Sequence, residues 1–293
     1  MATMDVAVAP RLRRRARTSG TRRRLPLPSK IAAAVIALLL LAAVFAPLLT
    51  PQSPTVGVLG DRLLGPGSGG HLLGTDGQGR DIFTRLVYGA RPSLLTGMIP
   101  VAVAGLIGTA FGLIAGLGKP LLHSSVMRFL DVFYAFPAVL LAIAIAAALG
   151  SGSSNAIIAL SVILIPPIAR VAEAETGRLR NADFMEAARA SGSSWSALAF
   201  RQVLPNIAPA VVVYCTALIG LSIVYSAGLS YLGLGIAPPT AEWGLMISDL
   251  QQYMFTTPSL LIAPALAIVV ASVAFNVLGD GLGNYLNVRS EIA

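Results

Sequence analysis

Charged residues are scarce in this 293-residue sequence: they make up 12% of the chain, whereas hydrophobic residues make up 55%. A soluble globular domain carries about a quarter charged residues. The mean hydropathy of +0.77 points the same way. Composition therefore predicts an integral membrane protein and excludes an ordinary soluble domain.

Cysteine, histidine and lysine are also rare, and each shortage removes a class of chemistry. The single cysteine, Cys215, cannot form a disulfide within the chain, and its apolar surroundings predict a small buried side chain. One cysteine and two histidines argue against a metal site made by this chain alone. Neither Lys30 nor Lys119 completes a phosphate-binding G-x-x-x-x-G-K-[ST] loop. We therefore predict a protein that is not an enzyme, with any nucleotide chemistry on a partner.

Six apolar stretches without charges follow one another along the chain, and we predict that each is a transmembrane helix. They are residues 31–49, 93–116, 132–150, 155–169, 207–226 and 258–279. Ion-coupled secondary carriers place ionisable side chains inside their spans. Because these stretches contain none, the sequence argues against that alternative.

An intramembrane aspartyl protease is the other alternative, since Asp131 and Asp280 both lie at span ends. Asp280 follows Gly279, which matches half of the Gly-x-Gly-Asp site of those enzymes, but Val277 replaces the first glycine. We interpret both aspartates as helix-end residues that make polar contacts.

The net charge of +8 comes from the N-terminus, because eight arginines and Lys30 lie within the first 30 residues. We predict that residues 1–30 form a basic cytoplasmic tail that meets anionic lipid and not nucleic acid. The basic stretch is too long for a secretory signal peptide, and no small-x-small cleavage site follows the apolar run. Residues 31–49 are therefore interpreted as a retained first span.

Orientation follows from where the other basic residues lie. With the N-terminus inside, all but four of the 21 Lys and Arg residues fall in cytoplasmic segments. The four in outer loops are Arg62, Arg80, Arg85 and Arg91. We expect an all-α protein with six spans and both termini in the cytoplasm. Residues 93–280 would form a five-helix core, and residues 281–293 a cytoplasmic C-terminus.

Residues 50–92 are expected to form an extracytoplasmic loop with two glycine turns, each followed by an acidic residue. The turn residues are Gly74, Thr75, Asp76 and Gly79, Arg80, Asp81. Such turns predict a compact loop held by local hydrogen bonds. Asp76, Asp81 and His71 could bind a metal, but carboxylates beside an arginine more often pair with it.

A polar segment, residues 181–206, interrupts the apolar pattern and reads as two short helices joined at a glycine. Asn181 is suited to cap the first helix, and Phe184, Ala187, Ala188 and Ser191 would share one face. Gly192 is the natural residue after the helix, since glycine adopts a left-handed conformation without penalty. Ser193 or Ser194 would cap the second helix. We expect Leu204-Pro205-Asn206 to end it.

Glycines recur every four residues in the second span, at Gly108, Gly112 and Gly116. They would line one helix face and allow a neighbouring backbone to come close. A second glycine-rich stretch, GLSYLGLGIAPPTAEWG at residues 228–244, follows the fifth span.

Three of these segments carry a family resemblance. Glu186-Ala187-Ala188, Gly192 and Leu204-Pro205 resemble the cytoplasmic "EAA" coupling loop of ABC importer permeases. The Gly-Thr-Asp and Gly-Arg-Asp pair and residues 228–244 resemble the second, or "C", permease of peptide and nickel importers. Two departures are Gln202, at a position that is aliphatic in the generic pattern, and Ser226, where relatives often carry an acid.

The resemblance covers about residues 30–290 and implies a type I permease fold whose coupling loop, residues 170–206, docks on an ATPase. It also implies a homologous second permease, two ATPase subunits that bind ATP and Mg²⁺, and an extracytoplasmic substrate-binding protein. No cofactor would be bound by this chain. The implied place is the cytoplasmic membrane of a bacterium or archaeon. The implied cargo is a di- or oligopeptide, with nickel or another small solute as the alternative.

Overall fold

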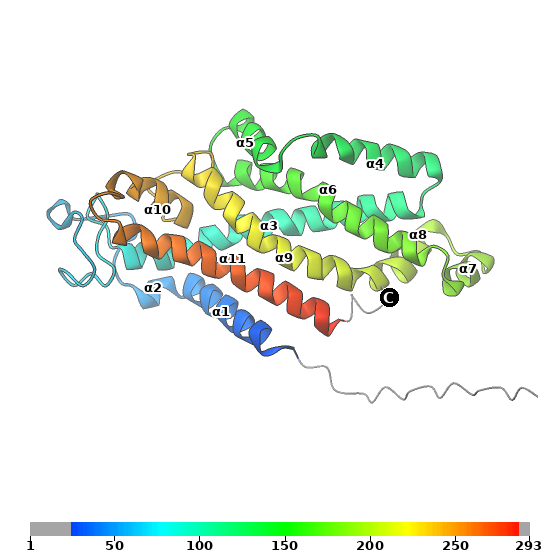
Figure 1. Ribbon diagram of the computed structural model, residues 1–293, viewed down its shortest axis with the longest axis horizontal. Helices are drawn as coiled ribbons and strands as arrows, with labels where there is room; N and C mark the ends of the chain where they lie inside the picture. Colours follow the sequence, from blue (N-terminus) through cyan, green and yellow to red (C-terminus); the bar gives the residue numbers. More distant parts are fainter. Residues whose placement is uncertain (1–24, 287–293) are drawn as a thin grey trace, which may run out of the picture.

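The computed structural model describes residues 25–286, a range in which the regular structure is helical apart from one isolated bridge between Thr75 and Asp81. The long helices run side by side along the long axis of the molecule (Figure 1). The elements in chain order are α1 Leu27–Val44, α2 Ala46–Leu49, η1 Leu59–Asp61, α3 Ile82–Leu117, α4 Pro120–Tyr134, α5 Ala138–Leu149, α6 Ser153–Leu179, α7 Asp183–Ala190, α8 Trp195–Ala197, η2 Leu198–Val203, α9 Leu204–Tyr231, α10 Trp243–Leu250, η3 Gln251–Tyr253 and α11 Ser259–Tyr285.

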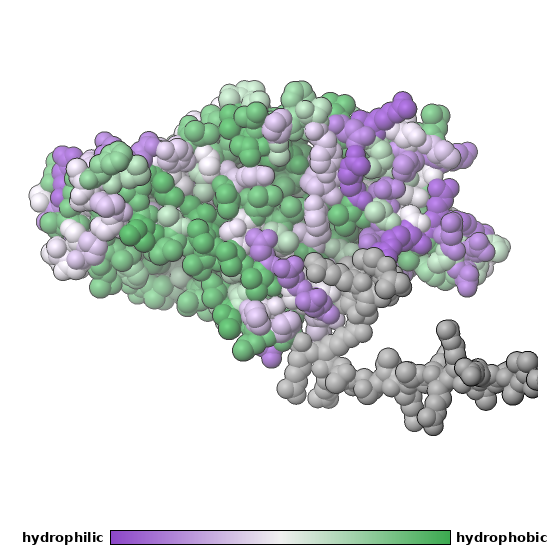
Figure 2. All heavy atoms as spheres, viewed as in Figure 1, coloured by the Kyte–Doolittle hydropathy of each residue, from purple (hydrophilic) through white to green (hydrophobic). Residues whose placement is uncertain are grey.

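Helices α3, α6 and α9 form the centre of the bundle. α3 packs along α6 and against α9, while α11 covers α9 and α1 covers α11. The outer loop and α10 lie at one end of the bundle and α7 at the other (Figure 1). Figure 2 shows hydrophobic surface across the middle and hydrophilic residues gathered around the α7 end. This division suits a bundle that crosses a bilayer.

Helices occupy most of each of the six predicted spans, and the predicted all-α membrane architecture is confirmed. Within residues 25–286, five helical stretches have the length and apolar composition of spans, and α4 with α5 makes a sixth if the bent pair counts as one. Four stretches, those containing α3, α6, α9 and α11, are longer than the sequence predicted.

The start of α3 corrects the predicted loop boundary. α3 begins at Ile82, eleven residues before the predicted span, so the outer loop ends at Asp81 and not at residue 92. The Asp81 carboxylate caps the helix by accepting the backbone N–H of Thr84 at 2.6 Å. Arg85 is 1% exposed. Burial of its side chain against the outer loop stabilises the helical turn, although its charge had suggested a polar loop in the sequence.

Both ends of the described range also differ from the predicted domain boundaries. α1 begins at Leu27, inside the predicted tail 1–30, and α11 extends to Tyr285, inside the predicted terminal segment 281–293. The remaining parts of those two predictions, residues 1–24 and 287–293, lie outside the described residues.

The third predicted span is bent. α4 ends at Tyr134, α5 begins at Ala138, and their axes differ by 85°. Pro137 precedes α5, and a proline there lacks an N–H and disfavours the α conformation in the residue before it. Non-helical backbone therefore interrupts this span.

The fifth span corrects the predicted role of Pro205. The helix does not end at Leu204-Pro205-Asn206, because α8, η2 and α9 form one continuous helical stretch from Trp195 to Tyr231. η2 is a turn of π-helix, in which the Leu204 N–H reaches back to the Ala199 carbonyl. Such a wide turn accommodates the change in hydrogen bonding that a proline imposes on a helix. α6 likewise continues ten residues beyond the predicted end at residue 169.

The glycine row of α3 lies against α6. A Cβ at Gly108 would press on the backbone of Ile165 and Ala169, and one at Gly112 would overlap the Cβ of Ala172. A Cβ at Gly116 would overlap the side chain of Thr176. At each of these positions the two helices are therefore too close to admit a side chain.

Gly112→Ala is expected to destabilise the protein, because the added methyl group occupies space already filled by α6. Overpacking of this kind costs about 1–3 kcal/mol, which should lower the midpoint of thermal unfolding of the purified protein in detergent. Gly228→Ala in α9 is the matched control, since nothing lies within 4 Å of a Cβ there. Equal midpoints for both variants would contradict the close packing of α3 on α6.

Candidate functional site

The coupling helix α7 is held by one face and exposed on the other. Met185 is fully buried in the hydrophobic core, Ala188 packs against the same core, and α7 contacts η2. Phe184, Ala187 and Ser191 are exposed on the opposite side. Most of the predicted face therefore points outward, whereas Ala188 turns partly inward.

Charges on α7 match the helix dipole. Asp183 and Glu186 lie in its first turn and Arg189 in its last. Glu186 is exposed, and within residues 25–286 no ion pair to its carboxylate is present. The N-terminal boundary differs from the prediction, since Ala182 and not Asn181 is the capping residue. The exposed carboxylate is available to a partner.

Gly192 ends α7 in the predicted left-handed conformation. Its φ is +77°, and the Ser193 N–H donates to the Ala188 carbonyl at 3.1 Å, the bond that closes a glycine-terminated helix. A Cβ at Gly192 would meet nothing within 4 Å. The glycine is thus required by backbone conformation and not by crowding. Ser194 caps the next helix through a bond from the Ala197 N–H at 3.3 Å.

The outer loop folds around Asp76, a buried carboxylate that is 3% exposed. Its oxygens accept the backbone N–H groups of Gln78 and Arg80 and the Arg80 guanidinium, the last at 2.6 Å. Gly74 and Gly79 both have positive φ, and a Cβ at either would overlap the backbone of the loop before it. The predicted compact loop with an arginine–carboxylate pair is present.

The sequence did not reveal the second half of this charge cluster, which comes from α10. Asp249 Oδ2 lies 3.1 Å from Arg80 and 3.4 Å from Arg85, and Arg85 also lies 3.5 Å from Asp76. Two buried arginines thus face two aspartates, so the charges balance. His71 Nδ1 lies 2.8 Å from Asp81. Within the described residues no group of three metal-ligating side chains occurs.

Glu242 anchors α10 on α3. Its carboxylate accepts the N–H groups of Gly244 and Leu245 and the hydroxyl of Ser93, and it is 1% exposed. The Ser93 hydroxyl in turn accepts the Trp243 N–H at 3.0 Å. This network explains the Glu-Trp-Gly part of the second motif. Burial raises the pKa of Glu242, although the hydrogen bonds to its carboxylate oppose the shift.

That raised pKa predicts a pH dependence of stability. Above pH 4.5, the ordinary value, the unfolded chain loses the Glu242 proton before the folded chain does. The free energy of unfolding should therefore fall as pH rises until the raised pKa is passed. Glu242→Gln, which cannot titrate, should remove this part of the slope in thermal unfolding measured at several pH values. An unchanged slope would contradict the assignment.

A charged pair lies beside the bend between α4 and α5. From the sequence alone, its two residues were known only to lie at the edges of two predicted spans. Arg170 of α6 forms an ion pair with Asp131 of α4, and its guanidinium lies 5.0 Å from the centre of the Tyr134 ring. Asp280 lies far along the chain on α11, which packs on α9 and α1. The two aspartates therefore belong to different parts of the bundle, unlike a protease pair.

Ser226, at the position where an acid was expected from the resemblance, makes a helix contact. Its hydroxyl donates to Thr96 Oγ1 of α3 at 2.7 Å, and both side chains are buried. The residue thus joins α9 to α3.

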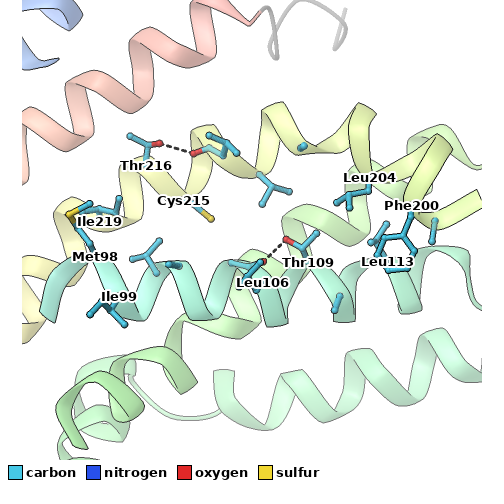
Figure 3. A pocket seen from close by; sticks show the side chains of 18 of the residues that line it. Met98, Ile99, Leu106, Thr109, Leu113, Phe200, Leu204, Cys215, Thr216 and Ile219 are labelled. Atoms are coloured by element: carbon cyan, nitrogen blue, oxygen red, sulfur yellow. Dashed lines mark hydrogen bonds between the residues drawn. The ribbon is translucent and has the colours of Figure 1, made fainter. Parts of the chain in front are cut away.

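A groove of about 900 Å³ runs between α3 and α9 (Figure 3). Its lining is apolar except for Thr109, Cys215 and Thr216. Both threonine hydroxyls donate to carbonyls of their own helices, Thr109 to Gly105 and Thr216 to Val212. With these donors already used, the groove suits an apolar surface better than a polar solute. Cys215 is partly exposed in it and not fully buried as predicted.

Within the described residues, five or six apolar spans with buried charges at one end of the bundle and an exposed, amphipathic helix at the other define a multi-span membrane protein. The comparisons agree. Residues 108–291 match the family of binding-protein-dependent transport system inner membrane components, and the chain belongs to this family.

The relatives match over nearly the whole chain. The glutathione transport system permease protein GsiD of Pectobacterium atrosepticum is 40% identical over 260 residues, 88% of this chain and 86% of that protein. The dipeptide transport system permease protein DppC of Alkalihalophilus pseudofirmus is 40% identical over 257 residues, 88% of this chain and 84% of that one. GsiD of Escherichia coli O6:K15:H31 is 41% identical over 258 residues, 88% and 85% of the two chains.

Solved structures share the fold. A chain from a crystal structure of the methionine ABC transporter MetNI in inward-facing conformations superposes with a TM-score of 0.57, covering 68% of this chain and 94% of that one. A second crystal form gives a TM-score of 0.56, with 67% and 93% covered. Sequence identity is 20% in both, so the likeness concerns the fold alone.

Proposed function

We propose that this chain is the C-type permease subunit of an ATP-driven importer of di- or oligopeptides in a bacterial cytoplasmic membrane. The observation that carries the proposal is identity of about 40% to glutathione and dipeptide permeases over 88% of the chain. Three structural features support a transport role: the outer charge cluster, the exposed α7 and the unbroken helix that leads from it.

The ATPase contact is proposed to be the outward face of α7. The small side chains of Ala187 and Ser191 allow a socket on the ATPase to approach closely, and Glu186 offers a charge to a basic residue there. α7 packs on η2, which continues without a break into α9. A push on α7 would therefore displace α9 as a whole, and alternation between two packings of the bundle would follow.

A second permease is proposed to cover the face formed by α4 and α5. Leu130 is buried in α4, but most other residues of this helix are at least partly exposed. The backbone break between α4 and α5 also lies on this side, and non-helical backbone is not tolerated against lipid. A homologous permease would supply the missing cover and enclose the pathway.

The function is tested by uptake in the cells that make this protein. Deleting its gene should abolish uptake of radiolabelled tripeptides, and the wild-type gene should restore it, while uptake of a free amino acid stays unchanged. The tagged chain purified in mild detergent should bring along a second permease and ATPases. Peptide uptake that persists without the gene, or a chain that purifies alone, would overturn the proposal.

Nickel is the alternative cargo. Within the described residues no group of metal ligands is present, but a metal delivered by a binding protein does not require ligands in the permease. Radiolabelled nickel uptake in the same deletion strain separates the two. Loss of nickel uptake with normal peptide uptake would reassign the substrate.

A further inference from the structure

Helices α1 and α11 enclose an apolar groove on the surface of the bundle. Its volume is about 470 Å³, and its lining residues lie between Leu27 and Val35 on α1 and between Val269 and Val277 on α11. Figure 1 shows both helices on the side of the bundle away from α4 and α5. The groove is therefore separate from the face proposed for a second permease.

The groove runs from one boundary of the hydrocarbon to about the middle of the bilayer. α1 has 18 residues and is about 27 Å long, close to the roughly 30 Å of a hydrocarbon core. Its start at Leu27 therefore lies near one boundary, and Val35 lies about 12 Å deeper. α11 carries no charge between residues 259 and 279. The groove thus has about the length of the hydrocarbon of one leaflet.

Large aliphatic side chains form the rim of the groove, and small ones form its floor. Ile31, Val269 and Val273 are more than half exposed, whereas Ala32 and Ala274 are each 5% exposed. Membrane helices approach each other closely through small residues at their contact surfaces. The branched side chains on the rim keep a further helix away from the floor, but a single acyl chain is narrow enough to lie between them. The shape therefore favours a lipid chain over another span.

Basic residues gather at the end of the groove that lies at the boundary. Lys30 is exposed in the first turn of α1, which contains no acidic residue, so the positive end of the helix dipole adds to its charge. Residues 22–24 are three arginines, and the chain from residue 24 to Leu27 spans at most about 11 Å. Asp280 of α11 is close to this end, since a Cβ on the next residue would overlap Ser29. Four basic residues against one acidic residue favour an anionic headgroup.

We propose that the groove between α1 and α11 binds one anionic phospholipid. One acyl chain lies along the groove over Ala32 and Ala274, and the phosphate group meets Lys30 at the basic end. Because basic residues mark the cytoplasmic side of a membrane protein, the lipid belongs to the cytoplasmic leaflet. The inference requires only that α1 and α11 are spans, so it does not depend on the cargo.

The test maps a photoreactive lipid on the assembled transporter in nanodiscs of phosphatidylcholine. The probe is phosphatidylglycerol with a diazirine in one acyl chain, and phosphatidylcholine with the same chain is the neutral comparison. Mass spectrometry should find cross-links concentrated in residues 27–35 and 269–277, with more from phosphatidylglycerol. Labelling spread evenly over the exposed apolar faces, or equal for both lipids, would mean annular lipid only and overturn the proposal. An unlabelled groove would mean that protein covers it, which also overturns the proposal.

Charge variants test the headgroup contact. Lys30→Gln should lower phosphatidylglycerol labelling of the groove about fivefold at a low probe concentration, since one basic residue near an anionic surface contributes about 1 kcal/mol. Phosphatidylcholine labelling should not change. Replacing Arg22, Arg23 and Arg24 by glutamine as well should bring the two lipids to the same level. Lys119→Gln, which removes the other lysine of the chain, is the control and should label as the wild type does. Unchanged phosphatidylglycerol labelling in Lys30→Gln would contradict the contact.

A groove-filling variant tests the acyl-chain contact. Val273→Trp places an indole ring in the groove and should remove labelling of residues 27–35 by both lipids. Leu266→Trp is the matched control, because Leu266 lies two turns earlier on α11, is 54% exposed like Val273, and does not line the groove. The control should keep wild-type labelling of residues 27–35. An equal loss in both variants, or no loss in Val273→Trp, would refute a chain bound in the groove.

Discussion

Glu186→Arg should abolish peptide uptake while leaving the protein in the membrane. Glu186 is exposed on the outward side of α7, so its replacement breaks no ion pair within the described residues. The change does reverse the charge that a basic ATPase residue would meet, which turns an attraction at the docking surface into a repulsion. Uptake should fall at least about twentyfold, since like charges brought together at an interface cost several kcal/mol. The measurement is tripeptide uptake in the deletion strain, with membrane insertion followed by immunoblot.

Lys119→Glu is the control for this prediction. Lys119 is also exposed, and its reversal changes the charge by the same amount on the segment between α3 and α4, outside α7. Uptake should stay near the wild-type level in this variant. A charge reversal on the ATPase residue that meets Glu186 should restore uptake in the Glu186→Arg strain. Normal uptake by Glu186→Arg itself would refute the coupling role of α7.

Substitutions at Gly192 separate backbone strain from bulk. Since a Cβ would meet no neighbour there, Gly192→Ala adds only the cost of a left-handed residue, about 1–2 kcal/mol. Gly192→Trp adds a large side chain beside the docking face as well. We therefore expect a partial loss of uptake with alanine and a complete loss with tryptophan. Equal effects would mean that conformation alone matters.

Asp76→Ala should cause the largest loss of stability in the outer loop. It removes the carboxylate that pairs with the buried guanidinium of Arg80 and faces Arg85, and it leaves two backbone N–H groups without an acceptor. Removing one partner of a buried ion pair costs about 3–5 kcal/mol, because the remaining charge stays buried. Hydrogen exchange of residues 54–85 should rise, and the thermal midpoint of the transporter should fall.

Two further variants test whether burial sets the size of this loss of stability. Asp249→Ala should cost less than Asp76→Ala, because Asp249 is 28% exposed and water can replace it. Asp61→Ala serves as the control for a loop aspartate outside the cluster. If the Asp76 and Asp249 variants lose equal stability, then burial does not set the strength of these pairs.

Contacts between residues far apart in the sequence explain why the sequence predicted which helices form better than where those helices begin and end. The Asp81 cap was visible as part of a motif, yet residues 82–92 contain Arg85, Arg91 and Pro92 and were read as loop. The partner that allows Arg85 to be buried in that turn, Asp249, lies more than 160 positions away. Pro205 was read as a helix end for a similar reason, because local preference does not reveal a π turn.

The residues of the candidate sites likewise divide into those that local sequence predicts and those that long-range packing determines. Gly192 was predictable, since a positive φ after a helix is a local property of glycine. Met185, which holds α7 in place, could have been found from the spacing of Ala182, Met185 and Ala188. The pairing of Asp131 with Arg170 could not, because it depends on how α4 packs against α6.

The unbroken helix from Trp195 to Tyr231 has a mechanical consequence. Its 37 residues span about 55 Å, long enough to connect the end of the bundle beside α7 with the end beside α10. At its outer end the Tyr231 hydroxyl bonds to Gln251, and Ser248 donates to the Tyr231 carbonyl at 3.0 Å. This one helix thus connects the surface that would receive a binding protein with the surface that would receive an ATPase. Docking on the outside should change the rate of ATP turnover inside even when no cargo is delivered.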